Sequence, residues 1–255
     1  MLMALTREIS DAFQACELTH LPRVPIDLER ARAQHAAYEW ALVEAGCTVR
    51  RLDSGPDMPD AVFVEDIAVV LDEGAVIGRP GAESRRAETP GVLEALARHG
   101  RPLQQIQAPG TLDGGDVLVI GRQVFVGSSA RSNRAGIDQL ARILGPVGYT
   151  MQVVPVRGCL HLKSAVTAIA PDSVLINRKW VSADAFAGLS LVDIDPQEPY
   201  AANALALADV VLYPTAFPRT RDRLEGRGLR VRAVDVDELQ KAEGAVTCCC
   251  LTFEM

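Results

Sequence analysis

Polar residues recur at nearly constant intervals along this chain of 255 residues, each beside an apolar run that is typical of a strand. Repeats of 40 to 50 residues are typical of architectures built from equivalent small units, such as propellers. This regularity limits the folds open to the chain more than any other feature. The residues are Asp66, Asp116, His161, Asn203 and Cys248, and the intervals between them are 50, 45, 42 and 45 residues.

Each repeat has the same predicted order of elements, namely a strand, a turn, a second strand and a helix. The fifth repeat begins at Thr247, close to the end of the chain, so its remaining strand must come from the N-terminus. A helix from Asp27 to Gly46 and a strand from Cys47 to Leu52 are expected before the first repeat. The predicted strand pairs are 61–71 with 75–79, 116–121 with 123–127, 161–170 with 173–177 and 203–207 with 209–213, and the predicted helices are 87–99, 135–144, 183–188 and 219–226.

The repeat also predicts how the units pack. A unit of two strands and one helix is unable to bury its own apolar face, so the units must close around an axis. We therefore predict a single closed α/β domain over residues 1–255, with corresponding strand ends meeting at one central site. A doubly wound open sheet also alternates strands and helices, but the repeated polar positions favour the closed form.

Composition excludes several classes of protein. The net charge is −7 and the basic residues are scattered, which argues against a nucleic-acid partner. No apolar run approaches the roughly 18 residues of a membrane span, and the N-terminus lacks the order of a signal peptide. The six cysteines are spread too unevenly for a disulfide framework. We therefore expect a cytoplasmic protein with reduced thiols and no membrane partner.

Three consecutive cysteines, Cys248, Cys249 and Cys250, stand near the C-terminus. Neighbouring cysteines do not easily pair with each other, and this spacing fits no common zinc site. Two interpretations remain, thiol chemistry or a buried strand in which cysteine serves as a small apolar residue. Along a strand Cys250 would share the face of Cys248, whereas Cys249 would point away and pack in the core.

His161 occupies the same repeat position as Cys248. Converging strand starts would bring its imidazole to the thiol, and a cysteine–histidine pair is an activated nucleophile. A histidine between apolar neighbours is, however, often only a hydrogen-bonded core residue.

Four carboxylates fall near the same positions, Glu65 with Asp66 and Asp113 with Asp116. Alone, the first pair is typical of a surface turn and the Asp-Gly-Gly-Asp run of a hairpin. Around a shared site they favour a cationic ligand. Arg85 and Arg131 follow the second strands of two repeats, and arginine forks bind carboxylates. The ligand is therefore expected to be a zwitterion with a cationic and an anionic end.

Taken as a set, these motifs resemble the dimethylarginine dimethylaminohydrolases from about Arg7 to Cys249. The resemblance implies the fold of the wider pentein superfamily of guanidine-modifying enzymes, a five-bladed α/β propeller, which agrees with the repeat. The matching motifs are FVED at 63–66, RPG at 79–81, SRR at 84–86, LDGGDVL at 112–118, VGS at 126–128 with Arg131 and Asn133, LHLKS at 160–164 and TCC at 247–249.

The resemblance also implies roles for individual residues. It places the nucleophile at Cys248, the general acid and base at His161, and the carboxylate that orients this histidine at Asp113. Ala242 and Glu243 stand where animal members have Val-Asp, at the methyl-group end of the pocket. The implied substrate contacts are Glu65 and Asp66 to the guanidinium, Asp60 and the main chain of Leu18 to the α-amino group, Arg85 and Arg131 to the α-carboxylate, and Ala242 to the methyl groups.

The implied reaction is hydrolysis of an Nω-methylated arginine, asymmetric dimethylarginine or monomethylarginine, to citrulline and dimethylamine or methylamine. It passes through a covalent thiouronium intermediate on Cys248 and needs no metal or organic cofactor. The alternatives are an arginine deiminase-type hydrolase, which releases ammonia, and a non-catalytic propeller that binds guanidino compounds. The small-molecule substrate is the expected partner, and the helical N-terminal face would allow a homodimer.

Overall fold

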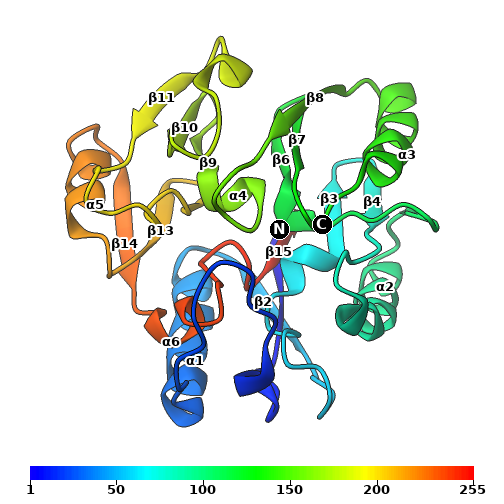
Figure 1. Cartoon of the computed structure of the whole chain (residues 1–255), viewed down its shortest axis with the longest axis horizontal. Coiled ribbons are helices and arrows are strands. Elements are labelled where there is room, and N and C mark those ends of the chain that lie inside the picture. Colours follow the sequence, from blue (N-terminus) through cyan, green and yellow to red (C-terminus); the bar gives the residue numbers. More distant parts are fainter.

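The computed structural model describes residues 1–255 and contains five separate sheets of three strands each (Figure 1). In every sheet the first strand runs antiparallel to the second, and the third runs parallel to the second. From first to third strand, the sheets are β15 (Leu251–Glu254), β1 (Leu2–Arg7) and β2 (Thr48–Leu52); β3 (Ala68–Leu71), β4 (Gly74–Ile77) and β5 (Leu103–Gln105); β6 (Val117–Ile120), β7 (Gln123–Ser128) and β8 (Thr150–Pro155); β9 (Val166–Ala170), β10 (Ser173–Ile176) and β11 (Ser190–Asp193); and β12 (Leu205–Leu207), β13 (Val210–Pro214) and β14 (Arg230–Val234).

The first strands of the five sheets surround a common axis. Residues of β3, β6, β9, β12 and β15 together line one cavity of ≈ 210 Å³. Figure 1 shows the sheets set around this centre like blades. The molecule is therefore a five-bladed α/β propeller, which confirms the predicted fold class and excludes an open doubly wound sheet.

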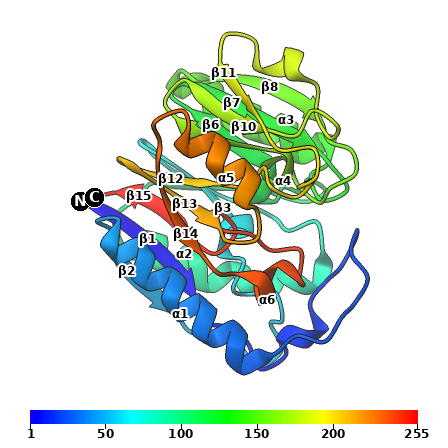
Figure 2. The ribbon, with the colours of Figure 1, turned by 90° about the vertical axis from the view of Figure 1, so that its left-hand side faces the viewer.

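The two ends of the chain complete one blade together. β15 pairs antiparallel with β1, with Leu2 opposite Glu254, and the amino group of Met1 donates to the carbonyl oxygen of Met255 at 3.1 Å. Figure 2 shows the termini side by side. The prediction that the N-terminus supplies the missing strand of the fifth repeat is confirmed.

The second and third strands of each blade are joined by a helical segment. In the first blade this is α1, where the Asp27 side chain accepts a hydrogen bond from the N–H of Arg30 and Gly46 ends the turn with a φ of 90°. The α-helices are α1 (Leu28–Glu44), α2 (Thr89–Arg98), α3 (Arg134–Leu144), α4 (Leu162–Ala165), α5 (Pro218–Glu225) and α6 (Asp237–Gln240), and the 3-10 helices are η1 (Phe13–Ala15), η2 (Val64–Ile67), η3 (Glu83–Glu88), η4 (Gly114–Asp116), η5 (Gly145–Val147) and η6 (Ala183–Phe186).

The sequence patterns missed the third strands of four blades, β5, β8, β11 and β14. These are edge strands on the rim of the propeller, and most of their residues are at least partly exposed. Because one edge and much of both faces meet solvent, they lack the apolar run that reveals a buried strand. The repeating unit is therefore three-stranded rather than two-stranded.

The predicted strand starts at 61–67 and 161–165 are wrong. Residues 61–67 form turns and η2, and His161 precedes the short helix α4. The apolar residues Ala61, Val62, Phe63 and Val64 are buried, so burial of a loop rather than strand formation explains the run. In each blade the polar repeat residue stands just before the first strand, not within it.

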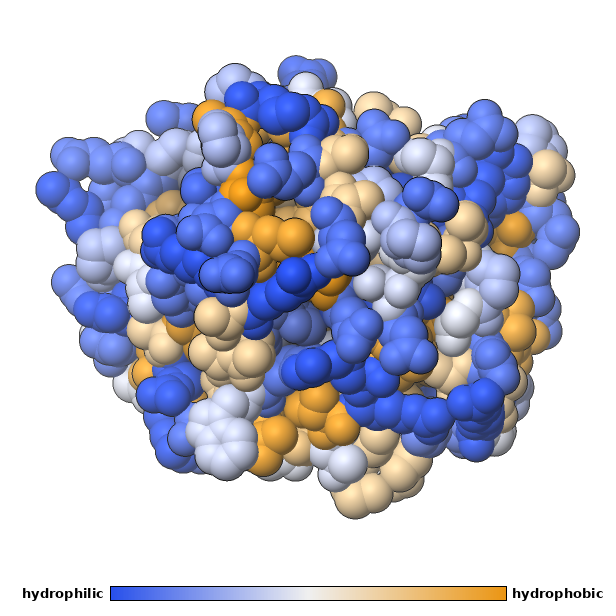
Figure 3. Space-filling model, turned by 90° about the horizontal axis from the view of Figure 1, so that it is seen from below, coloured by the Kyte–Doolittle hydropathy of each residue, from blue (hydrophilic) through white to orange (hydrophobic).

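Apolar clusters fill the space between neighbouring blades, and the largest joins α1 to the chain end through Tyr38, Leu42, Cys249 and Cys250. No helix combines the length and the apolar composition that a membrane span requires. On the face of the molecule drawn in Figure 3, hydrophilic residues predominate and the apolar patches between them are small. Trp40 and Val43 are exposed on α1, and the predicted homodimer stays a prediction.

Candidate active site

The five polar repeat positions converge at one end of the central axis, because each stands just before a first strand. Asp66 lies within η2, Asp116 is the last residue of η4, and His161 directly precedes α4. Asn203 and Cys248 stand just before β12 and β15. Hydrogen bonds cross between blades at this level: the side chain of Asp66 accepts from the N–H of Gly115, and that of Asn203 from the N–H of Thr247.

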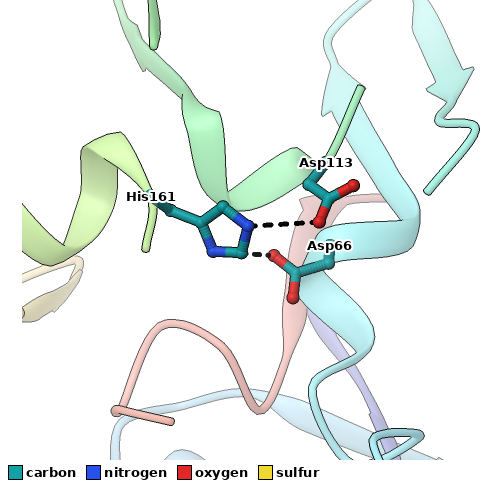
Figure 4. Close-up of side chains that lie close together, drawn as sticks. All are labelled: Asp66, Asp113 and His161. Atoms are coloured by element: carbon teal, nitrogen blue, oxygen red, sulfur yellow. Dashed lines mark hydrogen bonds and ion pairs between the residues drawn. The ribbon is translucent and has the colours of Figure 1, made fainter. Parts of the chain in front are cut away.

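His161 lies between two carboxylates (Figure 4). Its Nε2 is 3.1 Å from Oδ2 of Asp113 and its Nδ1 is 3.6 Å from Oδ1 of Asp66. All three side chains are buried. They are close enough to share a metal ion, but each ring nitrogen already faces a carboxylate, so the geometry is that of an oriented acid–base group.

The carboxylates determine the charge of this imidazole. Burial by itself lowers the pKa of His161, but the charge of Asp66, the hydrogen bond to Asp113 and the charge of Asp116 outweigh burial and raise the pKa to about 9. At neutral pH the imidazole therefore carries a proton that it is able to donate.

The Asp-Gly-Gly-Asp run is not a hairpin. A Cβ at Gly115 would lie 2.5 Å from Oδ1 of Asp66 and 2.7 Å from Nδ1 of His161. Only glycine lets the backbone pass this close to both groups. The second glycine therefore serves the packing of the acid–base group.

Asp66 is held ionised by its neighbours. Burial raises the pKa of this carboxyl group, but the charges of His161 and Arg85 and the hydrogen bond from Arg85 lower it to about 2. Nη1 of Arg85 donates to Asp66 at 2.5 Å. The remaining bonds of Arg85 go to the carboxylate of Glu88 and to the carbonyls of Asp60 and Phe63. In this structure Arg85 is thus directed to groups of the protein itself.

Glu65 is fixed by a second cation that the sequence analysis did not single out. Its Oε1 accepts from Nζ of Lys163 at 2.5 Å, and its Oε2 accepts from the Thr247 hydroxyl at 2.8 Å. The N–H of Glu65 donates to the carbonyl of Cys248. Glu65 therefore lies directly beside the cysteine turn. The available signal in the sequence was the position of Lys163 two residues after His161, which places this cation close to the predicted site.

Of the three cysteines, only Cys248 is accessible. Cys248 is partly exposed, whereas Cys249 and Cys250 are buried. The thiol of Cys249 donates a hydrogen bond to the carbonyl oxygen of Ala245, and the sulfur of Cys250 accepts one from the Tyr38 hydroxyl. The prediction that Cys249 packs in the core is confirmed. Strand alternation is not the reason, because Cys248 and Cys249 lie in a turn and Cys250 stands between that turn and β15.

Burial raises the pKa of the Cys248 thiol well above its usual value, and the charges of Glu65 and Asp66 raise it further. The thiol forms no hydrogen bond with His161, so the two groups are separate and the carboxylates lie near both. These effects outweigh the opposing charge of Lys163, so the thiol is protonated at neutral pH.

The loop around Leu18 brings a further group of predicted residues together. The carboxylate of Asp60 accepts from the N–H of Glu17, and Nη2 of Arg131 is 3.4 Å from the Thr19 hydroxyl. Burial raises the pKa of Asp60 to about 6, although Arg85 opposes this. Leu18 is half-buried in this loop. The loop that carries Leu18 therefore contacts both Asp60 and Arg131.

Glu243 holds this loop and was missed as a structural residue. Its Oε1 accepts hydrogen bonds from three consecutive N–H groups, those of Thr19, His20 and Leu21. Glu243 has a φ of 58°, which is uncommon for a residue with a side chain. Ala242 beside it is buried. The available signal in the sequence was the pair Ala242-Glu243, which stands where animal members of the family that the motifs resemble have Val-Asp.

Known proteins resemble this chain over nearly its whole length. The sequence profile of the arginine deiminase family matches residues 54–195. The N(G),N(G)-dimethylarginine dimethylaminohydrolase of Streptomyces coelicolor is 41% identical over 96% of this chain and 94% of its own length. The enzyme of that name from Pseudomonas aeruginosa is 36% identical over 89% of this chain and 90% of its own length.

Solved structures give the same result. A cysteine-to-serine mutant of the Pseudomonas aeruginosa enzyme, complexed with citrulline, has a TM-score of 0.94 at 34% identity and covers 98% of both chains. The N-terminal domain of a cyanobacterial arginine dihydrolase has a TM-score of 0.87 at 19% identity, covering 99% of this chain and 98% of that chain, and so shares the fold.

Proposed function

The chain belongs to the dimethylarginine dimethylaminohydrolase family, and we infer that it hydrolyses Nω-methylated arginine to citrulline and an alkylamine. One observation in the structure carries this function: a charged imidazole, two guanidinium-compatible carboxylates and one accessible thiol lie together at the converging blade ends. The substrate is thus a small molecule with a planar cationic end. The residue roles below are our proposal.

Glu65 and Asp66 hold the guanidinium of the substrate. Both are buried, and a buried cation is costly unless it is paired. Each carboxylate is itself fixed, Glu65 by Lys163 and Asp66 by Arg85. The planar cation is therefore bound in a defined orientation.

In the first half-reaction, the bound cation lowers the pKa of Cys248, the thiol proton passes to solvent, and the thiolate attacks the guanidinium carbon. His161 donates its proton to the departing dimethylamine or methylamine as the C–N bond breaks. The product is a thiouronium joined to Cys248. His161 is left neutral, and Asp113 keeps its ring oriented through Nε2.

In the second half-reaction, neutral His161 removes a proton from water, which attacks the same carbon. The C–S bond breaks and Cys248 departs as a thiolate, and the added hydroxyl group gives up its proton to this thiolate as the carbonyl group of citrulline forms. The imidazole has regained its charge. The carboxylates Asp66 and Asp113 favour the charged imidazole at this stage.

The amino-acid end of the substrate binds under the loop at Leu18. Asp60 and the main chain of Leu18 accept hydrogen bonds from the α-amino group. Arg131 binds the α-carboxylate, and the one hydrogen bond of its side chain within the protein is the long contact of 3.4 Å with the Thr19 hydroxyl. Arg85 is assigned to the same carboxylate, although most of its donors are directed to Asp66 and Glu88. Ala242 lies at the methyl-group end.

The test is a citrulline assay with asymmetric dimethylarginine, monomethylarginine and arginine. We expect the methylated substrates to give the higher kcat/KM, Cys248→Ser to abolish citrulline formation and Cys249→Ser to leave most of it. A higher kcat/KM for arginine would assign the chain to arginine deimination instead. Absence of citrulline with all three substrates would indicate a binding protein without turnover.

A further inference from the structure

Asp116 occupies a repeat position but takes no part in the reaction described above. It is fully buried in η4, beneath the acid–base group. A buried carboxylate is costly unless its oxygens are hydrogen-bonded. The partners of its two oxygens therefore show what it does.

One oxygen of Asp116 holds the backbone beside His161. Oδ1 accepts a hydrogen bond from the N–H of Leu162 at 2.9 Å. Leu162 is the first residue of α4 and follows His161 directly. This bond joins one blade to the next and fixes the point from which the imidazole projects.

The other oxygen holds the segment that supports Asp113. Oδ2 accepts from the hydroxyl of Ser132 at 2.7 Å, and the same hydroxyl accepts from the N–H of Asp113 at 3.2 Å. Oδ2 also accepts from the hydroxyl of Ser129 at 2.5 Å, which in turn accepts from the N–H of Arg131. One carboxylate thus fixes the backbone of His161 directly and that of Asp113 through Ser132.

The backbone around Asp116 leaves room for this carboxylate and no more. A Cβ at Gly127 would lie 2.5 Å from Oδ1 of Asp116 and 3.0 Å from Cβ of Leu162. A methyl group there would push directly against the bond between the two residues. Gly127 therefore provides a way to displace the carboxylate without removing its charge.

We propose that Asp116 is the positioning residue of the His161–Asp113 pair. It fixes the relative position of the two side chains by a hydrogen bond to the backbone beside His161 and, through Ser132, by one to the backbone of Asp113. This rests on the proposed function, since the pair is the acid–base group of that reaction. A displacement of a reacting group by about 1 Å costs on the order of 100-fold in rate. Asp116 therefore acts on kcat while touching neither substrate nor thiol.

The charge of Asp116 provides a readout that a purely structural residue would lack. The groups that face His161 are Asp66, Asp113 and Asp116, and the nearby cations Arg85 and Lys163 are paired to Asp66 and Glu65. Removing one negative charge lowers the pKa of the imidazole. Since His161 must be protonated to release the amine, the alkaline limb of the kcat profile then moves to lower pH.

The experiment measures kcat, KM and the pH profile of kcat for Asp116→Asn, Ser132→Ala and Gly127→Ala in the full-length chain. The references are the unmodified protein and the surface variant Asp172→Asn. We expect Asp116→Asn to lower kcat about tenfold or more, with a much smaller change of KM, and to move the alkaline limb by on the order of one pH unit. Ser132→Ala and Gly127→Ala retain the charge, so they are expected to lower kcat while moving the limb less. Asp172→Asn is expected to match the unmodified protein, because Asp172 is exposed.

Thermal unfolding of each variant separates positioning from loss of fold. If Asp116→Asn does not fold, the two charge-retaining variants decide the question. Unchanged kcat in the folded variants, or loss of activity only in proportion to unfolded protein with an unmoved limb, overturns the proposal. An unmodified protein without citrulline formation would overturn the proposed function instead.

Discussion

At the scale of single residues, the state of the Cys248 thiol depends on charge rather than on a hydrogen-bonded base. Burial and the carboxylates of Glu65 and Asp66 raise its pKa. The free protein therefore holds a protonated, weakly nucleophilic thiol, and in the proposed mechanism the bound cationic substrate favours the thiolate.

The first prediction follows from this raised pKa. Alkylation of Cys248 by iodoacetamide is expected to accelerate about tenfold per pH unit between pH 7 and 9, because only the thiolate reacts. Intact-mass spectrometry gives the rate, with Cys248→Ser as the control for other thiols. A rate that reaches a plateau below pH 8 would contradict a raised pKa.

The second prediction concerns Asp113. Asp113→Asn replaces the charged acceptor of the bond to Nε2 with a neutral amide and so removes one negative charge beside the imidazole. We expect kcat to fall about 100-fold and the alkaline limb of kcat to move to lower pH. Asp138→Asn is the matched control, because Asp138 is a partly exposed residue of α3 that pairs with the exposed Arg134. Citrulline formation at the normal rate in Asp113→Asn would remove Asp113 from the catalytic group.

The third prediction is a dependence of stability on pH. The pKa of His161 is raised from 6.5 to about 9 on folding, so its contribution is fully present below pH 6.5 and is lost as the pH rises to 9. The free energy of unfolding in urea should therefore fall between these pH values more steeply for the unmodified protein than for His161→Gln. Equal slopes for the two proteins would contradict the raised pKa.

At the scale of elements, the loop at residues 17–21 has no regular structure of its own and depends on Glu243. A single carboxylate oxygen accepts from three of its N–H groups. Removing this acceptor leaves three N–H groups without their partner, so we expect the loop to lose order around Thr19, His20 and Leu21. The loop carries Leu18 and contacts Asp60 and Arg131, so in the proposed binding mode its order affects how the amino-acid end of the substrate binds.

The fourth prediction tests this element. Glu243→Ala is expected to raise KM several-fold, with a smaller change of kcat, because three N–H groups of the loop lose their acceptor and a hydrogen bond contributes a net stabilisation on the order of 1 kcal/mol. Hydrogen exchange of the N–H groups of Thr19, His20 and Leu21 should accelerate. Glu225→Ala, at an exposed position of α5, is the control. Unchanged exchange in Glu243→Ala would show that other contacts hold the loop.

At the scale of the whole molecule, closure of the propeller depends on the last residues of the chain. β15 is the first strand of its blade and pairs with β1, so it joins residues separated by nearly the whole sequence. Phe253 is buried in the cluster between two blades, where it packs against His99. Leu251 and Phe253 therefore belong to the core.

The fifth prediction is that Phe253→Ala destabilises the protein by about 3–5 kcal/mol, the usual cost of removing a buried aromatic side chain. Met255→Ala, two residues on and largely exposed, is expected to change stability by less than about 0.5 kcal/mol. Urea unfolding measures both. Equal stabilities of the two variants would show that β15 contributes little to closure.

Much of the fold could be predicted because the central strands follow a strong rule. Buried strands such as β4, β7 and β13 require apolar runs, and the polar residues before the first strands recur with the blade. The rim strands β5, β8, β11 and β14 could not be predicted, since edge strands carry no comparable pattern. The buried loop at 61–64 was misassigned because burial produces an apolar run with or without a strand.

The repeat of five units and the joining of the two chain ends could be predicted from residue types and their spacing. These also made Cys248 and His161 candidates, and the family resemblance added the role of Asp113. The charges and hydrogen-bond partners within the site depend on the tertiary structure. The pKa of His161 depends on carboxylates from two other blades, Lys163 and Arg85 fix Glu65 and Asp66, and Asp116 joins the backbones of His161 and Asp113. Electrostatic and hydrogen-bonding partners are set by distance in space, and closing the propeller brings together groups that lie 45 residues or more apart along the chain.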